Sequence, residues 1–342
     1  MKEAMFYEKL EESKVRCGLC RFRCLITSGQ RGHCRVRENR DGTLYSLVYR
    51  RAVAEQVDPI QKKPLFHLLP GTTSYSVSTV GCNFRCLHCQ NYGIAQPYPP
   101  DVEGSGHDLS PEEIVKRAVD AGCRSIAYTY TEPTIFYEYA YDTAVLAKEA
   151  GLKNVFVTNG YIEEEPLKRI APYLDAANID LKGFTERFYR ETVQASLDEV
   201  LECIRHYKKL GIWIELTTLV IPGRNDDDEQ LQGIARFIAD ELGPSTPWHV
   251  TRFSPRYKMS DLPPTPTESL RAAVSTGVYA GLHYVYQGNV PGEGGGNTYC
   301  PGCGALLIRR YGYLVEKNLL STGCCPSCDS RIEGVWDGAS ES

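Results

Sequence analysis

Three cysteines lie close together in the stretch TVGCNFRCLHCQN, residues 79–91. Cys82, Cys86 and Cys89 follow the spacing C-x3-C-x2-C. A structural zinc, or an iron–sulfur cluster held entirely by protein, needs four ligands. Three thiolates on one short loop can instead hold three irons of a 4Fe–4S cluster, which leaves the fourth iron open to a further ligand. A zinc site completed by His88 is the alternative that the spacing permits.

Most of the fourteen cysteines are clustered. Clustered C-x2-C pairs in a chain without a secretion signal indicate metal ligands rather than a disulfide framework. Cys123 and Cys203 stand apart, and we expect both to be small buried hydrophobic residues. The two remaining clusters are an N-terminal set (Cys17, Cys20, Cys24, Cys34) and a C-terminal set (Cys300, Cys303, Cys325, Cys328).

The C-terminal set consists of two C-P-x-C pairs separated by 21 residues, which is typical of a zinc ribbon. Cys324 adjoins the second pair as a surplus cysteine, and a rubredoxin-like iron site is the rival interpretation. The N-terminal set could hold a second zinc or an auxiliary iron–sulfur cluster, with His33 as a substitute ligand. An auxiliary cluster would permit an electron relay.

An alternation of apolar, β-branched runs with helical stretches extends over residues 74–290. This pattern predicts an α/β fold with a parallel sheet, in the form of a partial (β/α)6-type TIM-like barrel; a closed barrel is the variant of the same prediction. Chemistry in such folds is located at the C-terminal ends of the strands. The predicted strands are residues 74–80, 125–130, 154–158, 177–181, 213–221, 248–253 and 283–287.

Local signals mark the ends of the helices between these strands. Ser110, Pro111 and Glu113 form an N-cap, a proline at the first helical position and a capping box. Glycines such as Gly122 and Gly151 follow the helices, where a left-handed cap is expected. The loop of Cys82 directly follows the first strand, so we expect it at the active face of the barrel.

Two cysteine-rich modules flank the barrel. We predict an N-terminal segment with a hairpin at residues 1–73, the barrel at residues 74–290, and a zinc-ribbon-like module at residues 291–342. A glycine-rich stretch, residues 288–297, has the composition of a flexible linker.

The C-x3-C-x2-C loop after the first barrel strand resembles that of radical S-adenosylmethionine (SAM) enzymes. The resemblance implies that the amino and carboxylate groups of SAM chelate the open iron. One electron from the cluster would then split SAM into methionine and a 5′-deoxyadenosyl radical, which abstracts hydrogen from a substrate. An electron donor such as flavodoxin or ferredoxin is implied as well.

The ends of the later strands look like those of the pyruvate-formate-lyase-activating branch of this family. The resemblance implies that Thr131 and Glu132 occupy the turn whose glutamate meets the methionyl amine in the family, with threonine here in place of the usual glycine. The resemblance also implies that His88 stacks on adenine. A simple helix N-cap for Glu132 and a structural ion pair between Asp180 and Lys182 are the alternative roles. The implied cofactor-binding residues are His88, Thr131, Glu132, Asn159, Asp180, Lys182 and Thr217.

Nearly the whole chain resembles one subgroup, the radical SAM enzymes of the AmmeMemoRadiSam system. The resemblance rests on both flanking cysteine sets and on the segment YVYQGN, residues 284–289. It implies a partner protein of the same system and leaves the substrate open.

Composition narrows the remaining possibilities. A formal charge of −5 gives no sign of a nucleic-acid partner. The charged first residues have no apolar core of a signal peptide, and no apolar run could span a bilayer, so we expect a cytoplasmic protein. Three hypotheses follow: a radical SAM enzyme with an undefined substrate, a glycyl-radical-enzyme activase, or a non-enzymatic iron–sulfur electron carrier.

Overall fold

The centre of the computed structural model is one sheet of eight strands, in the order β16-β15-β14-β13-β12-β11-β9-β8. The structure describes residues 1–96, 102, 104–290, 294–320 and 322–336. Seven strands of the sheet run parallel and correspond to the seven predicted runs. They are β9 (Thr73–Ser78), β11 (Ser125–Tyr128), β12 (Lys153–Thr158), β13 (Ala176–Asp180), β14 (Trp213–Val220), β15 (Trp248–Arg252) and β16 (Val285–Gly288).

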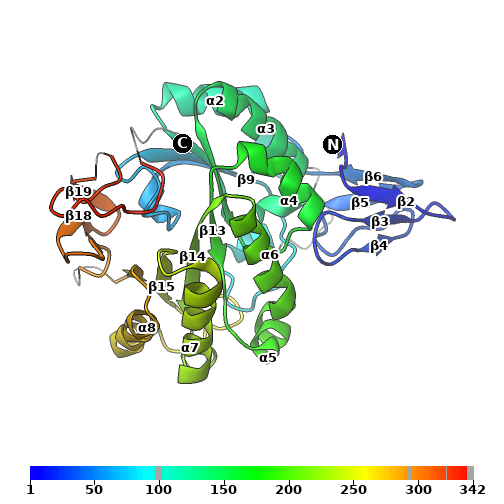
Figure 1. Ribbon diagram of the computed structural model, residues 1–342. Helices are drawn as coiled ribbons and strands as arrows, with labels where there is room; N and C mark the ends of the chain where they lie inside the picture. Colours follow the sequence, from blue (N-terminus) through cyan, green and yellow to red (C-terminus); the bar gives the residue numbers. More distant parts are fainter. Residues whose placement is uncertain (97–101, 103, 291–293, 321, 337–342) are drawn as a thin grey trace.

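Helices connect these strands, which gives six strand–helix units before β16. Helices α3, α4, α6 and α7 lie along one face of the sheet (Figure 1). The α-helices are α1 (Tyr92–Ala95), α2 (Pro111–Asp120), α3 (Tyr137–Glu149), α4 (Glu164–Ile170), α5 (Glu186–Phe188), α6 (Leu197–Lys209), α7 (Asp228–Phe237) and α8 (Thr267–Tyr279). Shorter 3-10 turns are η1 (Ile60–Lys62), η2 (Pro133–Phe136) and η3 (Ala171–Tyr173), and π-turns are η4 (Tyr189–Val193) and η5 (Ile238–Leu242).

The predicted caps are present. The Ser110 hydroxyl accepts the backbone N–H of Glu113 at 3.2 Å. Gly122 and Gly151 follow α2 and α3 with φ of +66° and +75°, the left-handed conformation that glycine adopts without steric cost. These local stop signals explain why the helix positions could be predicted from the sequence.

The barrel is not closed, because β16 and β8 form the two edges of the sheet. β8 (Ala54–Pro59) pairs antiparallel with β9 and was not predicted as a strand. Its sequence, AEQVDP, lacks a clear apolar alternation, because the one buried side chain of the strand is the polar Asp58. The sheet therefore begins earlier in the chain than residue 74.

The segment after β8 fills the interior of the open barrel. Ile60, Leu65 and Leu68 pack against the small inward-facing side chains of Ala127 and Ala176. The cavity lined by this segment and by the strand ends includes Gln61, Lys63 and Phe66. Both faces of the parallel sheet are thus covered, as such sheets require.

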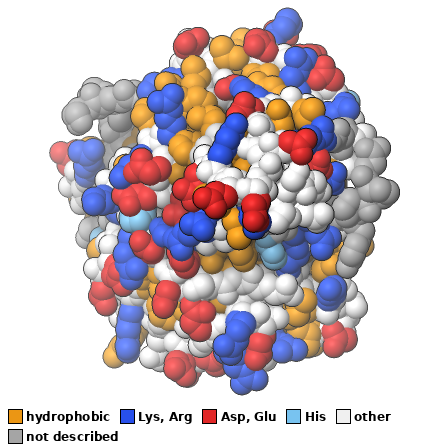
Figure 2. Space-filling view, turned by 90° about the vertical axis from the view of Figure 1, so that its right-hand side faces the viewer, with side chains coloured by type: hydrophobic (Ala, Val, Ile, Leu, Met, Phe, Trp, Pro, Cys, Tyr) orange, Lys and Arg blue, Asp and Glu red, His pale blue; other side chains and the backbone are white. Residues whose placement is uncertain are grey.

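The two flanking modules lie on opposite sides of the barrel (Figure 1). In the N-terminal module, the predicted hairpin is the β5–β6 pair with its turn at Asp41 and Gly42. Figure 2 faces this module and shows basic and acidic side chains interspersed over its surface. Its strands are β1 (Lys2–Glu3), β2 (Tyr7–Lys9), β3 (Val15–Cys17), β4 (Leu25–Ile26), β5 (Arg37–Arg40) and β6 (Thr43–Ser46); β7 (Arg51–Ala52) pairs with β10 (His107–Asp108).

The C-terminal module is a three-stranded sheet of β17 (Thr298–Tyr299), β18 (Leu306–Tyr311) and β19 (Leu314–Asn318). It is attached to the barrel by Arg310, which donates to the carbonyl of Phe66 at 2.8 Å. The predicted linker before it lies partly outside the described residues, at 291–293. Within the described parts of the chain, every helix is too short or too polar to cross a membrane.

Candidate active site

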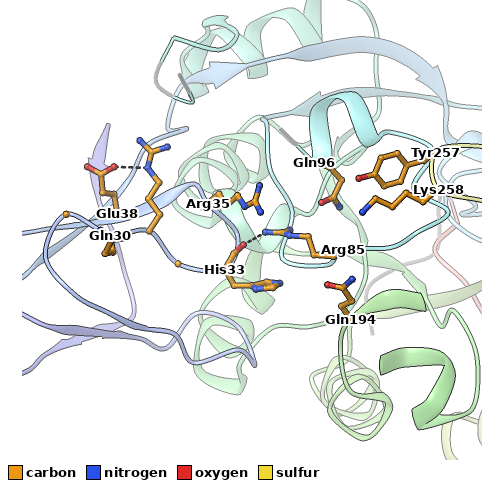
Figure 3. Close-up of a pocket in the computed structure, with 12 residues that line it drawn as sticks. Gln30, His33, Arg35, Glu38, Arg85, Gln96, Gln194, Tyr257 and Lys258 are labelled. Carbon is orange, nitrogen blue, oxygen red and sulfur yellow. Dashed lines mark hydrogen bonds and ion pairs between the residues drawn. The ribbon is translucent and has the colours of Figure 1, made fainter. Parts of the chain in front are cut away.

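Two cavities border the loop of Cys82, Cys86 and Cys89. The larger, about 940 Å³, lies between this loop and the N-terminal module (Figure 3). The other, about 520 Å³, lies in the mouth of the barrel and is lined by the three cysteines themselves. We take the second cavity as the candidate active site. It is lined by all the residues of this loop and of the strand ends that were predicted to bind the iron–sulfur cluster or the cofactor. These residues are Cys82, Cys86, His88, Cys89, Thr131, Glu132, Asn159, Asp180, Lys182 and Thr217.

Backbone hydrogen bonds fix the cysteine loop against the π-turn η4. Leu87 N–H donates to the carbonyl of Thr192 at 2.9 Å, and Arg85 N–H donates to that of Val193 at 3.1 Å. Phe84 N–H donates to the Cys82 sulfur at 3.3 Å. The loop is therefore held in place by a segment more than 100 residues later in the chain.

The three thiols are grouped in a largely buried pocket. Burial raises the pKa of Cys86 to about 12, and burial together with the Glu132 carboxylate raises that of Cys82. Such thiols lose their protons only when a cation balances the thiolate charge. The donor set thus fits a positively charged metal centre, and the open cavity beside it leaves room for a further ligand.

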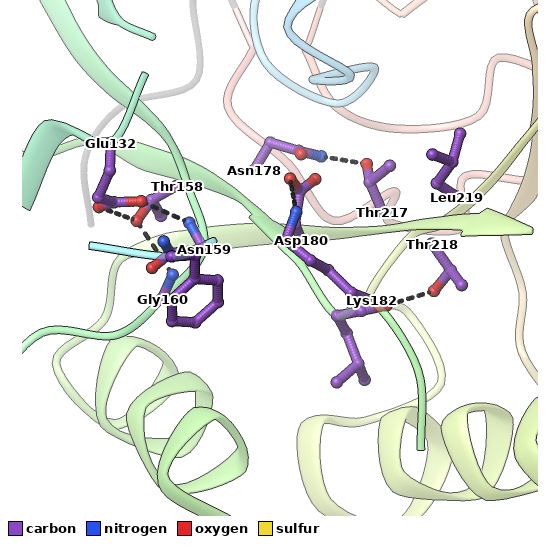
Figure 4. Close-up of polar contacts among 12 residues, drawn as sticks. Glu132, Thr158, Asn159, Gly160, Asn178, Asp180, Lys182, Thr217, Thr218 and Leu219 are labelled. Carbon is purple, nitrogen blue, oxygen red and sulfur yellow. Dashed lines mark hydrogen bonds and ion pairs between the residues drawn. The ribbon is translucent and has the colours of Figure 1, made fainter. Parts of the chain in front are cut away.

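Glu132 connects the ends of two neighbouring strands (Figure 4). Its carboxylate accepts from Thr134 (backbone N–H at 3.0 Å, hydroxyl at 2.6 Å), from the Thr158 hydroxyl at 2.7 Å and from Asn159 N–H at 2.8 Å. The contact with Thr134 is the predicted helix N-cap, at the start of η2. Burial raises the pKa of Glu132, although these hydrogen bonds oppose the shift.

Asn159 and Thr131 are buried beside this carboxylate. Asn159 donates to the side-chain oxygen of Asn83, in the cysteine loop, at 2.7 Å. The Thr131 hydroxyl donates to the carbonyl of Thr79, at the end of the first barrel strand, at 2.9 Å. Thr131 thus ties the second strand end to the first.

Asp180 and Lys182 form the predicted ion pair, with 2.7 Å between Oδ2 and Nζ (Figure 4). Burial disfavours the Lys182 ammonium, but the nearby Asp180 carboxylate, with a smaller contribution from the Cys86 sulfur, outweighs it and raises the pKa of Lys182. Both side chains still line the cavity. Thr217, from the next strand, accepts from Asn178 Nδ2 at 2.8 Å.

His88 is 5% exposed, and its Nδ1 has no hydrogen-bond partner. Burial, assisted by Lys182, lowers the pKa of His88 to about 3, so the ring is neutral. Among the described residues, His88 and the three cysteines do not form a compact group of ligand atoms within 4.8 Å. This spacing argues against the zinc site completed by His88.

Sequence reasoning missed several residues that line the same cavity. Lys63 is buried in an ion pair with Asp58 (Nζ to Oδ2, 2.6 Å), and burial lowers the pKa of Lys63 to about 8. His249 Nε2 lies 2.7 Å from Glu215 Oε2. Tyr313 lines the cavity from the C-terminal module. No local motif marks these side chains, because they belong to segments that meet only in the folded chain.

The C-terminal set is a compact group of potential metal ligands. All four ligand atoms lie within 4.8 Å of one another, with Cys300 and Cys328 sulfurs at 3.5 Å and those of Cys303 and Cys325 at 3.7 Å. A tetrahedron of thiolates at the Zn–S distance of 2.3 Å has S–S separations of about 3.8 Å. The four cysteines could therefore bind a metal, and Cys324 is not part of the group.

The N-terminal set is arranged differently. Cys17, Cys20, Cys24 and Cys34 line one small cavity, but they do not form a compact group within 4.8 Å. Cys123 and Cys203 are buried singly, as predicted.

Comparison with known proteins identifies a family match and relatives of this chain. Residues 76–235 match the family described as the Radical SAM superfamily. The protein MJ0808 of Methanocaldococcus jannaschii, itself uncharacterized, is 51% identical over 337 residues, which are 98% of this chain and 100% of that protein.

More distant relatives cover part of the chain. The pyruvate formate-lyase 1-activating enzyme of Escherichia coli K12 is 23% identical over 47% of this chain and 66% of its own length. A radical SAM methyltransferase structure from Sphaerobacter thermophilus superposes with a TM-score of 0.50 at 17% identity, over 65% of this chain and 68% of that one. The structural likeness concerns the fold alone.

Proposed function

We propose that Cys82, Cys86 and Cys89 hold a 4Fe–4S cluster with an open iron, because this chain belongs to one family with MJ0808 and its residues 76–235 match the Radical SAM superfamily. When bound, this cluster would supply one electron to cleave SAM to methionine and a 5′-deoxyadenosyl radical, which takes hydrogen from a substrate. The radical SAM domain makes the chain an enzyme; its substrate is open.

One observation carries the proposal: the three cysteines and the seven implied cofactor-binding residues line a single cavity at the C-terminal ends of the strands. SAM is a zwitterion with an amine, a carboxylate and ribose hydroxyls, and the cavity wall offers both charges. Glu132 offers an acceptor to the amine, and Asn159, Asp180, Lys182 and Thr217 offer polar groups to the rest. Thr131 shapes the turn beside Glu132, and the neutral, unpartnered ring of His88 suits stacking on adenine.

Anaerobic reconstitution, reduction and addition of SAM provide the test. We expect 5′-deoxyadenosine to form, and Cys86→Ala to abolish it while zinc in the C-terminal module is retained. Cys123→Ala is the matched control, since Cys123 is buried away from the cavity. If no 5′-deoxyadenosine forms from protein with a full cluster, the proposal is wrong.

A glycyl-radical activase is the second candidate, favoured by the similarity to the Escherichia coli activating enzyme. It would transfer the radical to a glycine of a partner enzyme. Activases with extra clusters carry those cysteines between early barrel elements, whereas this chain places them before and after the barrel. A glycine-centred EPR signal on a co-expressed partner would support this function, and its absence across candidate partners would favour another substrate. The non-enzymatic electron carrier is disfavoured, because a carrier needs no cofactor cavity beside its cluster.

The finer assignments are also proposals. We propose that the C-terminal set holds zinc, because the S–S distances of 3.5 and 3.7 Å suit a tetrahedral zinc. We further propose membership of the AmmeMemoRadiSam-system subgroup, with a partner protein and a flavodoxin or ferredoxin as electron donor. We propose a division into three modules, at residues 1–73, 74–290 and 291–342. Strand β8 belongs to the N-terminal module but pairs with β9 in the sheet of the barrel.

A further inference from the structure

Four cysteines of the N-terminal module converge on one small cavity outside the active site. Cys17 lies at the end of β3, and Cys20, Cys24 and Cys34 come from the loops that follow. All four are free of disulfides. Gly32 is part of the wall: a Cβ on it would lie 3.2 Å from Ile26 and 3.7 Å from the Cys24 sulfur. The cavity is completed by Leu19, Ile26, Gly32, Arg37 and Ile135.

The separation of the sulfurs distinguishes this set from the C-terminal one. Among the described His, Cys, Asp and Glu residues, the C-terminal set is the compact group with all ligand atoms within 4.8 Å. The N-terminal set falls outside that limit, as do Cys82, Cys86 and Cys89. Cysteines around one zinc are about 3.8 Å apart, whereas those of a cluster bind different irons and stand farther apart. The N-terminal sulfurs are therefore not drawn together as around one metal ion, and a cluster, whose cysteines bind different irons, accommodates wider spacing.

Two N–H groups are available to anionic sulfur in this cavity. His33 N–H donates to the Cys24 sulfur at 3.4 Å. Arg37 is 1% exposed and lines the cavity; its Nη1 donates to Glu138 Oε2 at 3.2 Å, while its Nε has no hydrogen-bond partner. A buried, unpartnered guanidinium N–H is costly, and an anionic cluster would satisfy it.

The N-terminal set adjoins the cysteine loop of the active site. A Cβ on Gly81 would lie 2.6 Å from Val36 and 3.3 Å from the carbonyl oxygen of Cys34. Arg85 donates to the Cys82 carbonyl at 2.7 Å and also to the carbonyl of His33 (Figure 3). The residues beside Cys34 thus touch those beside Cys82, with no intervening layer of side chains.

We propose that Cys17, Cys20, Cys24 and Cys34 hold a second 4Fe–4S cluster that passes single electrons to the cluster of the active site. When bound, the N-terminal cluster would take one electron from a low-potential one-electron carrier protein, going from 2+ to 1+, and would return to 2+ by giving that electron to the active-site cluster. No atom or proton is transferred. The relay rests on the proposed function; cluster binding by the four cysteines does not.

The larger cavity provides a face where such a carrier can bind. It lies over the loop of Cys34 and the side chain of Arg85 (Figure 3). Four cationic side chains and one carboxylate line it: Arg31, Arg35, Arg85, Lys258 and Glu38. Arg31 is paired with Glu38 at 2.7 Å, so the face is positive overall and suits a carrier with an acidic surface.

Iron content tests cluster binding in the full chain. Wild type, reconstituted anaerobically, should hold about eight irons, two clusters of four. Replacing Cys82, Cys86 and Cys89 by alanine should leave about four irons and a reduced-cluster EPR signal that SAM does not change. Adding Cys20→Ser should remove this iron, whereas adding Cys123→Ser should not. About four irons in wild type, or zinc in place of iron in the triple variant, would overturn the proposal.

Two reductants test the relay. In otherwise wild-type protein, Cys20→Ser should lower 5′-deoxyadenosine formation in two assays, one reduced by flavodoxin and one by dithionite. The loss in the flavodoxin assay should be at least about tenfold greater than the loss in the dithionite assay. Equal effects on both reactions would overturn the relay. If wild type forms no 5′-deoxyadenosine even with dithionite, the proposed function fails, while the iron content still decides whether the second cluster exists.

Discussion

The Glu132 carboxylate accepts the backbone N–H of Asn159 at 2.8 Å, which joins the ends of β11 and β12 across the barrel mouth. The same side chain accepts from Thr134 and Thr158 and lines the candidate active site. One residue therefore has two tasks: it holds two strand ends together, and it offers a negative charge to a ligand. The alternatives of structural cap and ligand contact are not exclusive here.

Glu132→Gln separates these tasks, because glutamine keeps the shape and loses the charge. We expect SAM to bind at least about tenfold more weakly and the free energy of unfolding to fall by about 1–3 kcal/mol, since one amide N–H would face existing donors. Equilibrium dialysis with the reconstituted protein measures the first effect and urea unfolding the second. Glu165→Gln, on an exposed side chain of α4, is the control. Unchanged SAM affinity would exclude Glu132 from the cofactor site.

Glu215→Leu should destabilise the attachment of the C-terminal module. The buried Glu215 carboxylate accepts from the backbone N–H groups of Phe66 and His67, at 2.9 and 2.8 Å, from Trp213 Nε1 at 3.1 Å, and contacts His249. Removing it leaves several buried donors without partners, at a cost on the order of 3–5 kcal/mol. Urea unfolding followed by tryptophan fluorescence measures the loss. A change below about 1 kcal/mol would show that water replaces the carboxylate.

Acid should loosen the same region through His67. Burial lowers the pKa of His67 to about 4, because its ring is enclosed between Glu333 and Tyr286. The unfolded chain takes up this proton near pH 6.5, so the stabilisation is complete above that pH and is lost as the pH falls towards 4. The full effect is roughly 3 kcal/mol.

Hydrogen exchange at residues 66–69 and 333–336, measured between pH 7 and 4.5 and corrected for intrinsic rates, reports this change. His67→Gln cannot titrate and should flatten the pH dependence of protection in these segments. The same slope in wild type and His67→Gln would show that His67 does not carry the effect.

Cys303→Ser should remove about one zinc per chain and leave the iron unchanged. Cys324→Ser is a closely matched control, because Cys324 adjoins Cys325 but lies outside the compact group. Metal analysis by mass spectrometry gives both values. Zinc loss from the Cys324 variant, with zinc retained in the Cys303 variant, would contradict the assigned ligand set.

Much of this fold could be predicted because its signals are local. Apolar β-branched runs and the Ser110 cap depend on neighbouring residues, and they placed the parallel strands and the helices between them. β8 was missed because an exposed edge strand is defined by its partner rather than by its own pattern. Lys63 and His249 were missed in the cavity for the same reason, since each lies beside residues distant in the sequence.

The amino-acid sequence by itself determined which side chains can bind a metal: the C-x3-C-x2-C loop, the two flanking cysteine sets and the polar residues at the strand ends. The type of each ligand and its spacing along the chain can be taken directly from the sequence. Only the tertiary structure decided that the C-terminal sulfurs are close enough for one metal ion while the N-terminal sulfurs are not. It also decided that Cys34 lies against Gly81, beside the active-site loop. Distances between atoms on separate segments depend on long-range packing, which no local pattern contains.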